Sequence, residues 1–288
     1  MMDAFNALLA LPAPAFAALV GVFGLFVGSF LNVVIARLPV MLERRWAAEC
    51  AELSGQPVPE HPPFNLLRPG SRCPHCGAGV RPWHNVPLAG YLLLGGRCAD
   101  CRAPISPRYP LIELATGVLF ALNAWLLGPG VWLAGALLLT AALVALTMID
   151  AATQLLPDDI TLPLVWAGIA FHLVYGVLPL ADAVVGAMAG YLVLWSVYWL
   201  FKLVTGKEGM GYGDFKLLAA LGAWLGWQML PLIILLSSLV GALWGILQIA
   251  LSRMGRGQPL PFGPYLAAAG YVALLWGHDI VGWYLGRL

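Results

Sequence analysis

Long apolar runs, each about as long as a membrane-crossing helix, constrain the fold of this chain more than any other feature. The first run, Ala15–Ala36, has 22 residues and contains no charged side chain. A helix of roughly 20 predominantly apolar residues spans the hydrocarbon core of a bilayer. Only 10% of the chain is charged, whereas about a quarter of a typical soluble domain is charged. The sequence therefore predicts an all-α polytopic membrane protein.

The apolar pattern predicts about eight transmembrane helices along the 288 residues. The sixth segment is short, and Pro231 separates it closely from the seventh. The first segment contains Gly28 and Ser29, whose small size would permit close helix packing, and Asn32, which would need a hydrogen-bond partner. The eight segments are Ala15–Ala36, Leu111–Leu127, Val131–Ile149, Ile160–Leu178, Ala183–Phe201, Phe215–Met229, Leu232–Leu251 and Tyr265–Leu285.

The region from Arg37 to Arg108 differs in composition from the rest of the chain. It holds nine of the fifteen Lys and Arg residues, all four paired cysteines and many prolines. This is the one region polar enough to be a soluble domain. We therefore expect a first transmembrane helix in residues 1–36, a polar domain in residues 37–110 and a membrane-embedded domain in residues 111–288.

The distribution of Lys and Arg over the loops predicts the orientation, because positive charge accumulates on the cytoplasmic side of a membrane. With the N-terminus outside, the inside regions are 37–110, 150–159, 202–216 and 252–264, and they hold fourteen of the fifteen basic residues. Only Arg287 then lies outside. We therefore expect both termini to face away from the cytoplasm and the polar domain to face it.

Two Cys-x-x-Cys pairs, Cys73 with Cys76 and Cys98 with Cys101, are separated by 21 residues. Two such pairs form a four-cysteine zinc site, since zinc prefers a tetrahedral thiolate shell. The competing interpretation is two disulfides, but cytosolic thiols stay reduced. We predict a structural zinc ion rather than a catalytic one, because four thiolates leave no open position for a substrate. Cys50 is most simply a free thiol.

Two aspartates lie where expected helices meet the cytoplasmic face. Asp150 follows the uncharged run Val131–Ile149, and Asp214 ends the motif Gly-Tyr-Gly-Asp at residues 211–214. A carboxylate at the mouth of a membrane helix is costly to desolvate, so it is a functional candidate. The alternative is that Asp214 only caps the following helix and Asp150 only ends the preceding one. The presence of two such aspartates, together with glycines that permit close approach of another segment, favours a catalytic role over capping.

A pair of nearby carboxylates has a characteristic chemistry. The two groups cannot both ionise easily, so they share one proton. The charged member takes a proton from a water that attacks a carbonyl, and the protonated member donates to the developing oxyanion. Three other acids have simpler interpretations: Asp158 and Asp159 as solvated loop or helix-capping groups, and Glu113 as an acid favoured near the start of its helix by the dipole.

With these residues in hand, the chain resembles the type IV prepilin peptidases, the bifunctional leader peptidase/N-methyltransferases of pilus and type II secretion systems. The resemblance covers nearly the whole chain. Besides the paired cysteines and Asp150, its elements are GSFLNVV at residues 28–34, RLP at 37–39, RYPLIE at 108–113, LPD at 156–158, GYGD at 211–214 and PFGP at 261–264.

The resemblance implies an intramembrane-type aspartic peptidase with Asp150 and Asp214 as its catalytic residues. It implies cleavage of a prepilin or pseudopilin after the glycine that ends the leader, at the cytoplasmic face of the bacterial inner membrane. It also implies methylation of the new N-terminal amine from S-adenosylmethionine, with Gly96 implicated. No Gly-x-Gly-x-x-Gly motif supports the methyltransferase activity independently.

Two other classes of function stay open at this point. A transporter would use Asp150 and Asp214 as a proton or cation relay, because membrane acids are common in such proteins. It predicts an acid near the bilayer midplane and two repeated halves, and the sequence shows neither. A non-catalytic scaffold would use the zinc domain as an assembly platform. Attraction to anionic membrane lipid explains the basic cytoplasmic residues, so no nucleic-acid partner is expected.

Overall fold

The structure, a computed structural model, describes residues 11–251 and 260–286. It divides into two compact units, an N-terminal unit of residues 1–129 and a C-terminal unit of residues 130–288. Three basic residues used in the orientation argument, Arg253, Arg256 and Arg287, lie outside the described residues. The orientation and the three-part division expected from composition therefore stay predictions.

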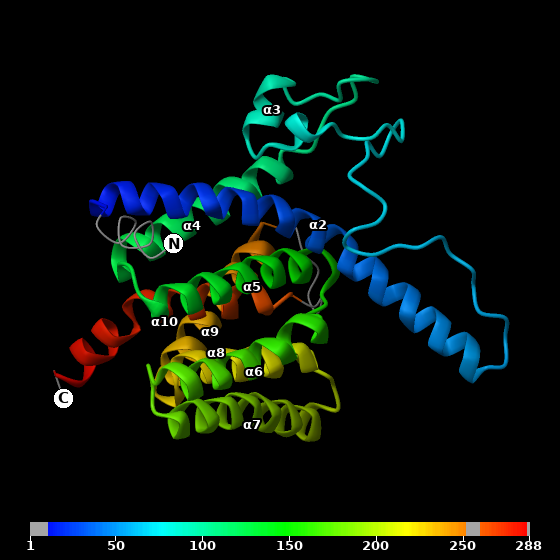
Figure 1. The fold of residues 1–288 in the computed structure, drawn as a ribbon. Helices are drawn as coiled ribbons and strands as arrows, with labels where there is room; N and C mark the ends of the chain where they lie inside the picture. The colour runs from blue at the N-terminus through cyan, green and yellow to red at the C-terminus, as the bar shows by residue number, and fades with distance from the viewer. Residues whose placement is uncertain (1–10, 252–259, 287–288) are drawn as a thin grey trace. The chain divides into compact units, whose positions relative to one another are not determined.

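The described residues form helices and no strands apart from two isolated bridges, which confirms the all-α fold class. Each of the eight predicted apolar segments overlaps one of eight main helices, and the sixth also covers η2 (Figure 1). The main helices are α2 (Ala13–Leu53), α4 (Arg108–Leu127), α5 (Val131–Thr153), α6 (Asp158–Tyr175), α7 (Leu180–Thr205), α8 (Tyr212–Leu225), α9 (Leu230–Ala250) and α10 (Gly263–Leu285). The short ones are η1 (Pro82–Asn85), α3 (Ala89–Leu93) and η2 (Trp227–Met229).

The helices are apolar enough for a membrane protein. Among the described residues, five helical segments are long and hydrophobic enough to cross a bilayer, namely α2, α4, α5, α7 and the stretch Trp227–Ala250. The predicted number of about eight spans stays a prediction. Helix α8 has only 14 residues, and at 1.5 Å per residue it is about 21 Å long, which is shorter than a bilayer core of about 30 Å.

Helix α2 does not end where the composition changes at Arg37. It continues to Leu53, with Pro39 inside it, and the chain leaves the helix at Ser54 and at Gly55, whose φ is +67°. A change from apolar to polar residues marks a change of environment and is not a helix stop. The stop is the left-handed conformation at Gly55, which glycine adopts without steric cost.

The boundary between the sixth and seventh segments also lies elsewhere than expected. Helix α8 ends at Leu225 because Gly226 has φ +83°, and the single turn η2 precedes α9. Pro231 occupies the first turn of α9, where its missing N–H costs no helical hydrogen bond. At its other end α8 already begins at Tyr212, so Asp214 lies inside a helix rather than before one.

In the N-terminal unit, α2 packs along α4 through glycines, as the small residues predicted (Figure 1). A Cβ atom at Gly24 would lie 2.7 Å from the Cβ of Phe120, and one at Gly28 would lie 2.8 Å from the Cα of Glu113. Such close approach of two helix backbones is typical of small-residue interfaces in membranes. The predicted partner of Asn32 is also present, because its Nδ2 donates to the Tyr109 carbonyl at 3.1 Å.

In the C-terminal unit, the short helix α8 lies among α6, α7 and α10 and is almost completely buried. It contacts α7 where Gly186 meets Gly222, and a Cβ at either position would overlap the backbone of the other. On its other side the Trp224 indole donates from Nε1 to the Leu164 carbonyl of α6 at 2.9 Å. This packing fixes α8 and therefore fixes the position of Asp214 at its first turn.

Candidate functional site

Asp150 lies in the last full turn of α5 and is 5% exposed. Its Oδ2 accepts a hydrogen bond of 3.0 Å from the backbone amide of Gly263, the first residue of α10. The interpretation that Asp150 merely ends its helix is wrong, because α5 continues to Thr153. The side chain instead joins the end of α5 to the start of α10.

Asp214 is the third residue of α8 and is 6% exposed. Gly211, the residue before the helix, lies beside its carboxyl group, since a Cβ built there would be 3.9 Å from Oδ2. The other carboxyl oxygen, Oδ1, is buried and has no hydrogen-bond partner among the described residues. Leaving such an oxygen unpaired is costly, and at a functional site it marks a position for a reacting group.

Both aspartates line one open cavity of about 680 Å³ within the C-terminal unit, and the two carboxyl groups are close enough to interact electrostatically. The end of α5, the residues just before α10, the start of α8 and the loop before α8 form its walls. The remaining lining residues are Gln154, Leu155, Leu156, Asp158, Glu208, Gly209, Met210, Gly211, Tyr212, Gly213, Leu260, Pro261 and Phe262.

Two glycines allow the elements around this cavity to meet. A Cβ at Gly213 would lie 2.7 Å from the Cβ of Leu156, so the second glycine of the motif does permit the close approach expected of it. A Cβ at Gly263 would lie 2.6 Å from Oδ2 of Asp150. Gly263 belongs to the PFGP motif at residues 261–264, and its contact with Asp150 gives this glycine a role that the motif alone did not indicate.

The other charged residues at this cavity form ion pairs. Asp158, the first residue of α6, binds Lys216 of α8 with an Nζ–Oδ1 distance of 2.6 Å, so it is more than a solvated loop group. Glu208 pairs with Lys202 at 2.8 Å. The hydrogen bond from Lys202 lowers the pKa of Glu208. Both carboxylates are mostly exposed, and pairs of this kind contribute little to stability.

The four paired cysteines meet in the N-terminal unit, as the doubled motif predicted. The Sγ atoms of Cys73, Cys76, Cys98 and Cys101 all lie within 4.8 Å of one another, with Cys73 and Cys101 separated by 3.8 Å. All five cysteines of the chain are free thiols. A tetrahedral metal with bonds of about 2.3 Å to sulfur holds its ligands roughly 3.8 Å apart, so this cluster has the spacing of a metal site.

Each Cys-x-x-Cys pair sits in a tight turn. The amide of Cys73 donates to Ala78, and that of Cys98 donates to Ala103, each at 2.9 Å. The backbone amides of Cys76 and His75 lower the pKa of the Cys73 thiol to about 6. Because metals bind the thiolate form, these turns prepare Cys73 as a ligand.

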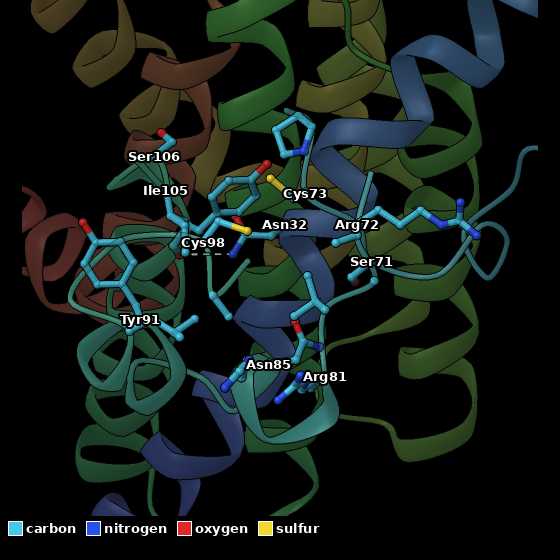
Figure 2. Close-up of a pocket in the computed structure, with 18 of the residues that line it drawn as sticks. Asn32, Ser71, Arg72, Cys73, Arg81, Asn85, Tyr91, Cys98, Ile105 and Ser106 are labelled. Carbon is cyan, nitrogen blue, oxygen red and sulfur yellow. Dashed lines mark hydrogen bonds between the residues drawn. The ribbon is translucent and has the colours of Figure 1, made fainter. Parts of the chain in front are cut away.

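A second cavity, of about 490 Å³, lies beside the cysteines in the N-terminal unit. Figure 2 shows Asn32 of α2 together with Cys73 and Cys98 around this cavity. Tyr91 also lines it, and Gly96 lies directly against that tyrosine. Gly96 has φ +69°, and a Cβ added to it would be 2.9 Å from the Tyr91 hydroxyl.

The structure gives Glu113 a different role from the one expected. Its side chain is buried, and its Oε2 accepts a hydrogen bond of 2.8 Å from the backbone amide of Leu88, at the start of α3. The helix dipole alone does not explain such a contact. Glu113 also lines the cavity of the N-terminal unit, a role that its position near a helix start could not reveal.

Comparisons with known proteins are consistent over nearly the whole chain. Residues 22–127 match the family described as the bacterial peptidase A24 N-terminal domain, and residues 137–246 match the type IV leader peptidase family. The chain is 60% identical to a protein of Aeromonas hydrophila named prepilin leader peptidase/N-methyltransferase, with 93% of each chain covered.

Two further relatives carry the same name. One, from Pseudomonas aeruginosa, is 59% identical with 91% of each chain covered, and one from Burkholderia pseudomallei is 51% identical with 93% of this chain and 88% of the relative covered. No solved structure matches the chain. At this identity and coverage, the chain belongs to the type IV leader peptidase family.

Proposed function

We propose that this protein removes the leader peptide of type IV prepilins or pseudopilins and N-methylates the new N-terminal residue. The name shared by its relatives supports both activities. One observation carries the peptidase assignment: Asp150 and Asp214 reach one cavity from different helices, and Asp214 Oδ1 is buried there without a partner among the described residues. A buried oxygen without a partner is rare in a folded protein, and the attacking water or the substrate would supply the missing hydrogen bond.

The two carboxyl groups perform the cleavage as a pair that shares one proton. The charged member takes a proton from the water held between them, and the water attacks the scissile carbonyl. The protonated member donates to the developing oxyanion, and a proton then goes to the leaving amine. The Gly263 amide holds the Asp150 carboxyl group in place while this happens, and the burial of α8 holds Asp214.

The methyltransferase activity takes its methyl group from S-adenosylmethionine, and we assign it to the N-terminal unit. A zinc ion held by Cys73, Cys76, Cys98 and Cys101 fits the donor set there, because four thiolates at this spacing form the closed tetrahedral shell of a structural zinc site. The ion would hold the two cysteine turns together, and its four thiolate ligands would leave no coordination position for a substrate. The cysteine turns and the start of α4 would then be a stable wall beside the second cavity.

Location follows from the apolar helices and from the charge distribution. The protein spans the bacterial inner membrane, with the zinc site and the aspartate pair on the cytoplasmic side. The fourteen-to-one distribution of basic residues supports that orientation. Basic side chains on this side attract anionic lipid head groups.

The proposed function is tested by incubating the purified protein with a full-length prepilin, with and without S-adenosylmethionine, and measuring product masses. We expect leader removal under both conditions and one added methyl group only when the donor is present. An uncut prepilin in the presence of folded, zinc-containing protein would contradict the proposal.

Gly263→Ala should reduce cleavage by roughly tenfold to a hundredfold, because a misplaced catalytic group costs about that much. The added Cβ would lie 2.6 Å from Oδ2 of Asp150, so either the carboxylate or the start of α10 must shift. Gly282→Ala is the matched control on the same helix, since a Cβ there meets nothing within 4 Å. Cleavage rates with a prepilin substrate provide the measurement, and equal rates for the two variants would refute the role of Gly263.

Gly96→Ala should lower methylation, by roughly tenfold or more, and should leave cleavage nearly unchanged. The new methyl group would displace the Tyr91 hydroxyl from the cavity wall. Gly95→Ala is the control. It introduces the same backbone strain at a similar φ of +60°, but its added Cβ meets nothing within 4 Å. Both activities are measured by product mass. A parallel fall in cleavage and methylation, in protein that keeps its zinc, would show that the two sites are not separable in this way.

A further inference from the structure

The cavity beside the cysteines combines acceptor oxygens and positive charges in a way that points to one ligand. Its volume of about 490 Å³ lies within the range of about 300–1,000 Å³ typical of small-molecule sites. Residues of α2, the two cysteine turns, η1, α3 and the start of α4 all line it, and they belong to the same unit. The cavity is thus assembled from sequence segments far apart in the chain.

Two buried side chains bring acceptor oxygens to this cavity. Asn32 donates its Nδ2 to the Tyr109 carbonyl, and its Oδ1 is not used in that hydrogen bond. Glu113 accepts from the Leu88 amide through Oε2, and its Oε1 is not used in that hydrogen bond. Both residues are more than nine-tenths buried. A carboxylate and an amide oxygen on one wall favour a cationic ligand group, because a buried charge needs a partner.

The rest of the cavity is lined by three arginines, one further acid, Asp100, and aromatic side chains. Arg37, Arg72 and Arg81 line it, and arginine is the side chain best suited to bind a carboxylate. Tyr91 and Tyr109 add faces on which a planar ring can stack. Figure 2 shows Arg81 and Tyr91 among the residues around the cavity.

We propose that this cavity is the binding site for S-adenosylmethionine, with Glu113 and Asn32 facing its cationic part and the arginines its carboxylate. The donor carries a sulfonium, an ammonium, a carboxylate and a planar adenine, which together match the walls. The other methylation substrate, a peptide N-terminus, has an amine but no neighbouring carboxylate, so three arginines favour the donor. The inference rests on the proposed methyltransferase activity and assigns that activity a place.

Three variants of the full-length, zinc-loaded protein test this placement by equilibrium dialysis with S-adenosylmethionine. Glu113→Gln keeps an oxygen to accept from Leu88 and removes only the charge. Val33→Trp fills the cavity from α2, because Val33 lines it. Val22→Trp makes the same change at a position of α2 that is 50% exposed and does not line the cavity.

We expect Glu113→Gln to weaken donor binding by roughly tenfold to a hundredfold, the range for losing a charged hydrogen-bond partner. Val33→Trp should abolish binding, and Val22→Trp should bind like the unmodified protein. All three should keep their zinc and cleave prepilin at the normal rate, which shows that they are folded. S-adenosylhomocysteine, which lacks the sulfonium charge, is the second ligand, and a smaller effect of Glu113→Gln on it would assign Glu113 to the sulfonium.

Two results would overturn the inference in distinguishable ways. If the unmodified protein binds the donor and Val33→Trp and Glu113→Gln bind it equally well, the site lies elsewhere and the proposed function is untouched. If the unmodified protein cleaves prepilin but neither binds the donor nor methylates the product, the methyltransferase half of the proposed function fails together with the site.

Discussion

Asp150→Asn and Asp214→Asn should each abolish prepilin cleavage, with a loss on the order of a thousandfold or more, as for members of other catalytic groups that act together. Asparagine keeps the size of the side chain and one oxygen, so at position 150 it can still accept from the Gly263 amide and hold α10 in place. It cannot take up the proton that the attacking water must lose. The rates are measured on purified variants whose folding matches that of the unmodified protein.

The two losses should not add. A carboxylate pair works as one unit, so removing either member disables it and the double variant should resemble either single one. Asp158→Asn is the matched control at the same cavity. It gives up an exposed ion pair with Lys216, which is worth little, so it should keep most of the activity. Near-normal cleavage by either Asp150→Asn or Asp214→Asn would rule out the mechanism.

Cys98→Ser should remove the zinc ion and unfold the cysteine turns. Metal binding and folding of such small sites are coupled, so we expect the zinc content to fall from one ion per protein to nearly none. Methylation should be lost, whereas cleavage, which we assign to the aspartates of the C-terminal unit, should fall much less. Elemental analysis and product masses provide the measurements.

Cys50→Ser is the control for that experiment, because Cys50 is an exposed free thiol outside the cluster. It should keep both its zinc and its methylation activity. The zinc assignment would be contradicted if unmodified protein purified without chelators contained no zinc.

Features encoded by local composition could be predicted from the sequence. Apolar runs identified each of the eight main helices among the described residues, because burial in lipid selects for continuous apolar residues. The spacing of the two Cys-x-x-Cys motifs predicted that Cys73 and Cys98 would meet, since a metal shell requires it. Asp150 and Asp214 were named because an acid in such a segment is costly, and the structure brings both to one cavity.

Features that depend on tertiary contacts could not be predicted in the same way. The contact of Gly263 with Asp150 joins residues 113 positions apart, and nothing in the local sequence of either residue specifies the other. The same holds for Glu113 and Leu88, whose hydrogen bond turns a helix-start acid into a cavity residue. The end of α2 was misplaced because polarity was taken as a boundary, whereas Gly55 ends the helix.

The central claim, that Asp150 and Asp214 hydrolyse a peptide bond rather than carry ions, has one direct test. The purified protein and its two asparagine variants are reconstituted in liposomes that contain prepilin and a pH-sensitive dye. We expect the unmodified protein to release the leader without moving protons, and both variants to leave the prepilin intact. Intact prepilin with the unmodified protein, together with a proton flux that either substitution abolishes, would contradict the account and favour a transporter.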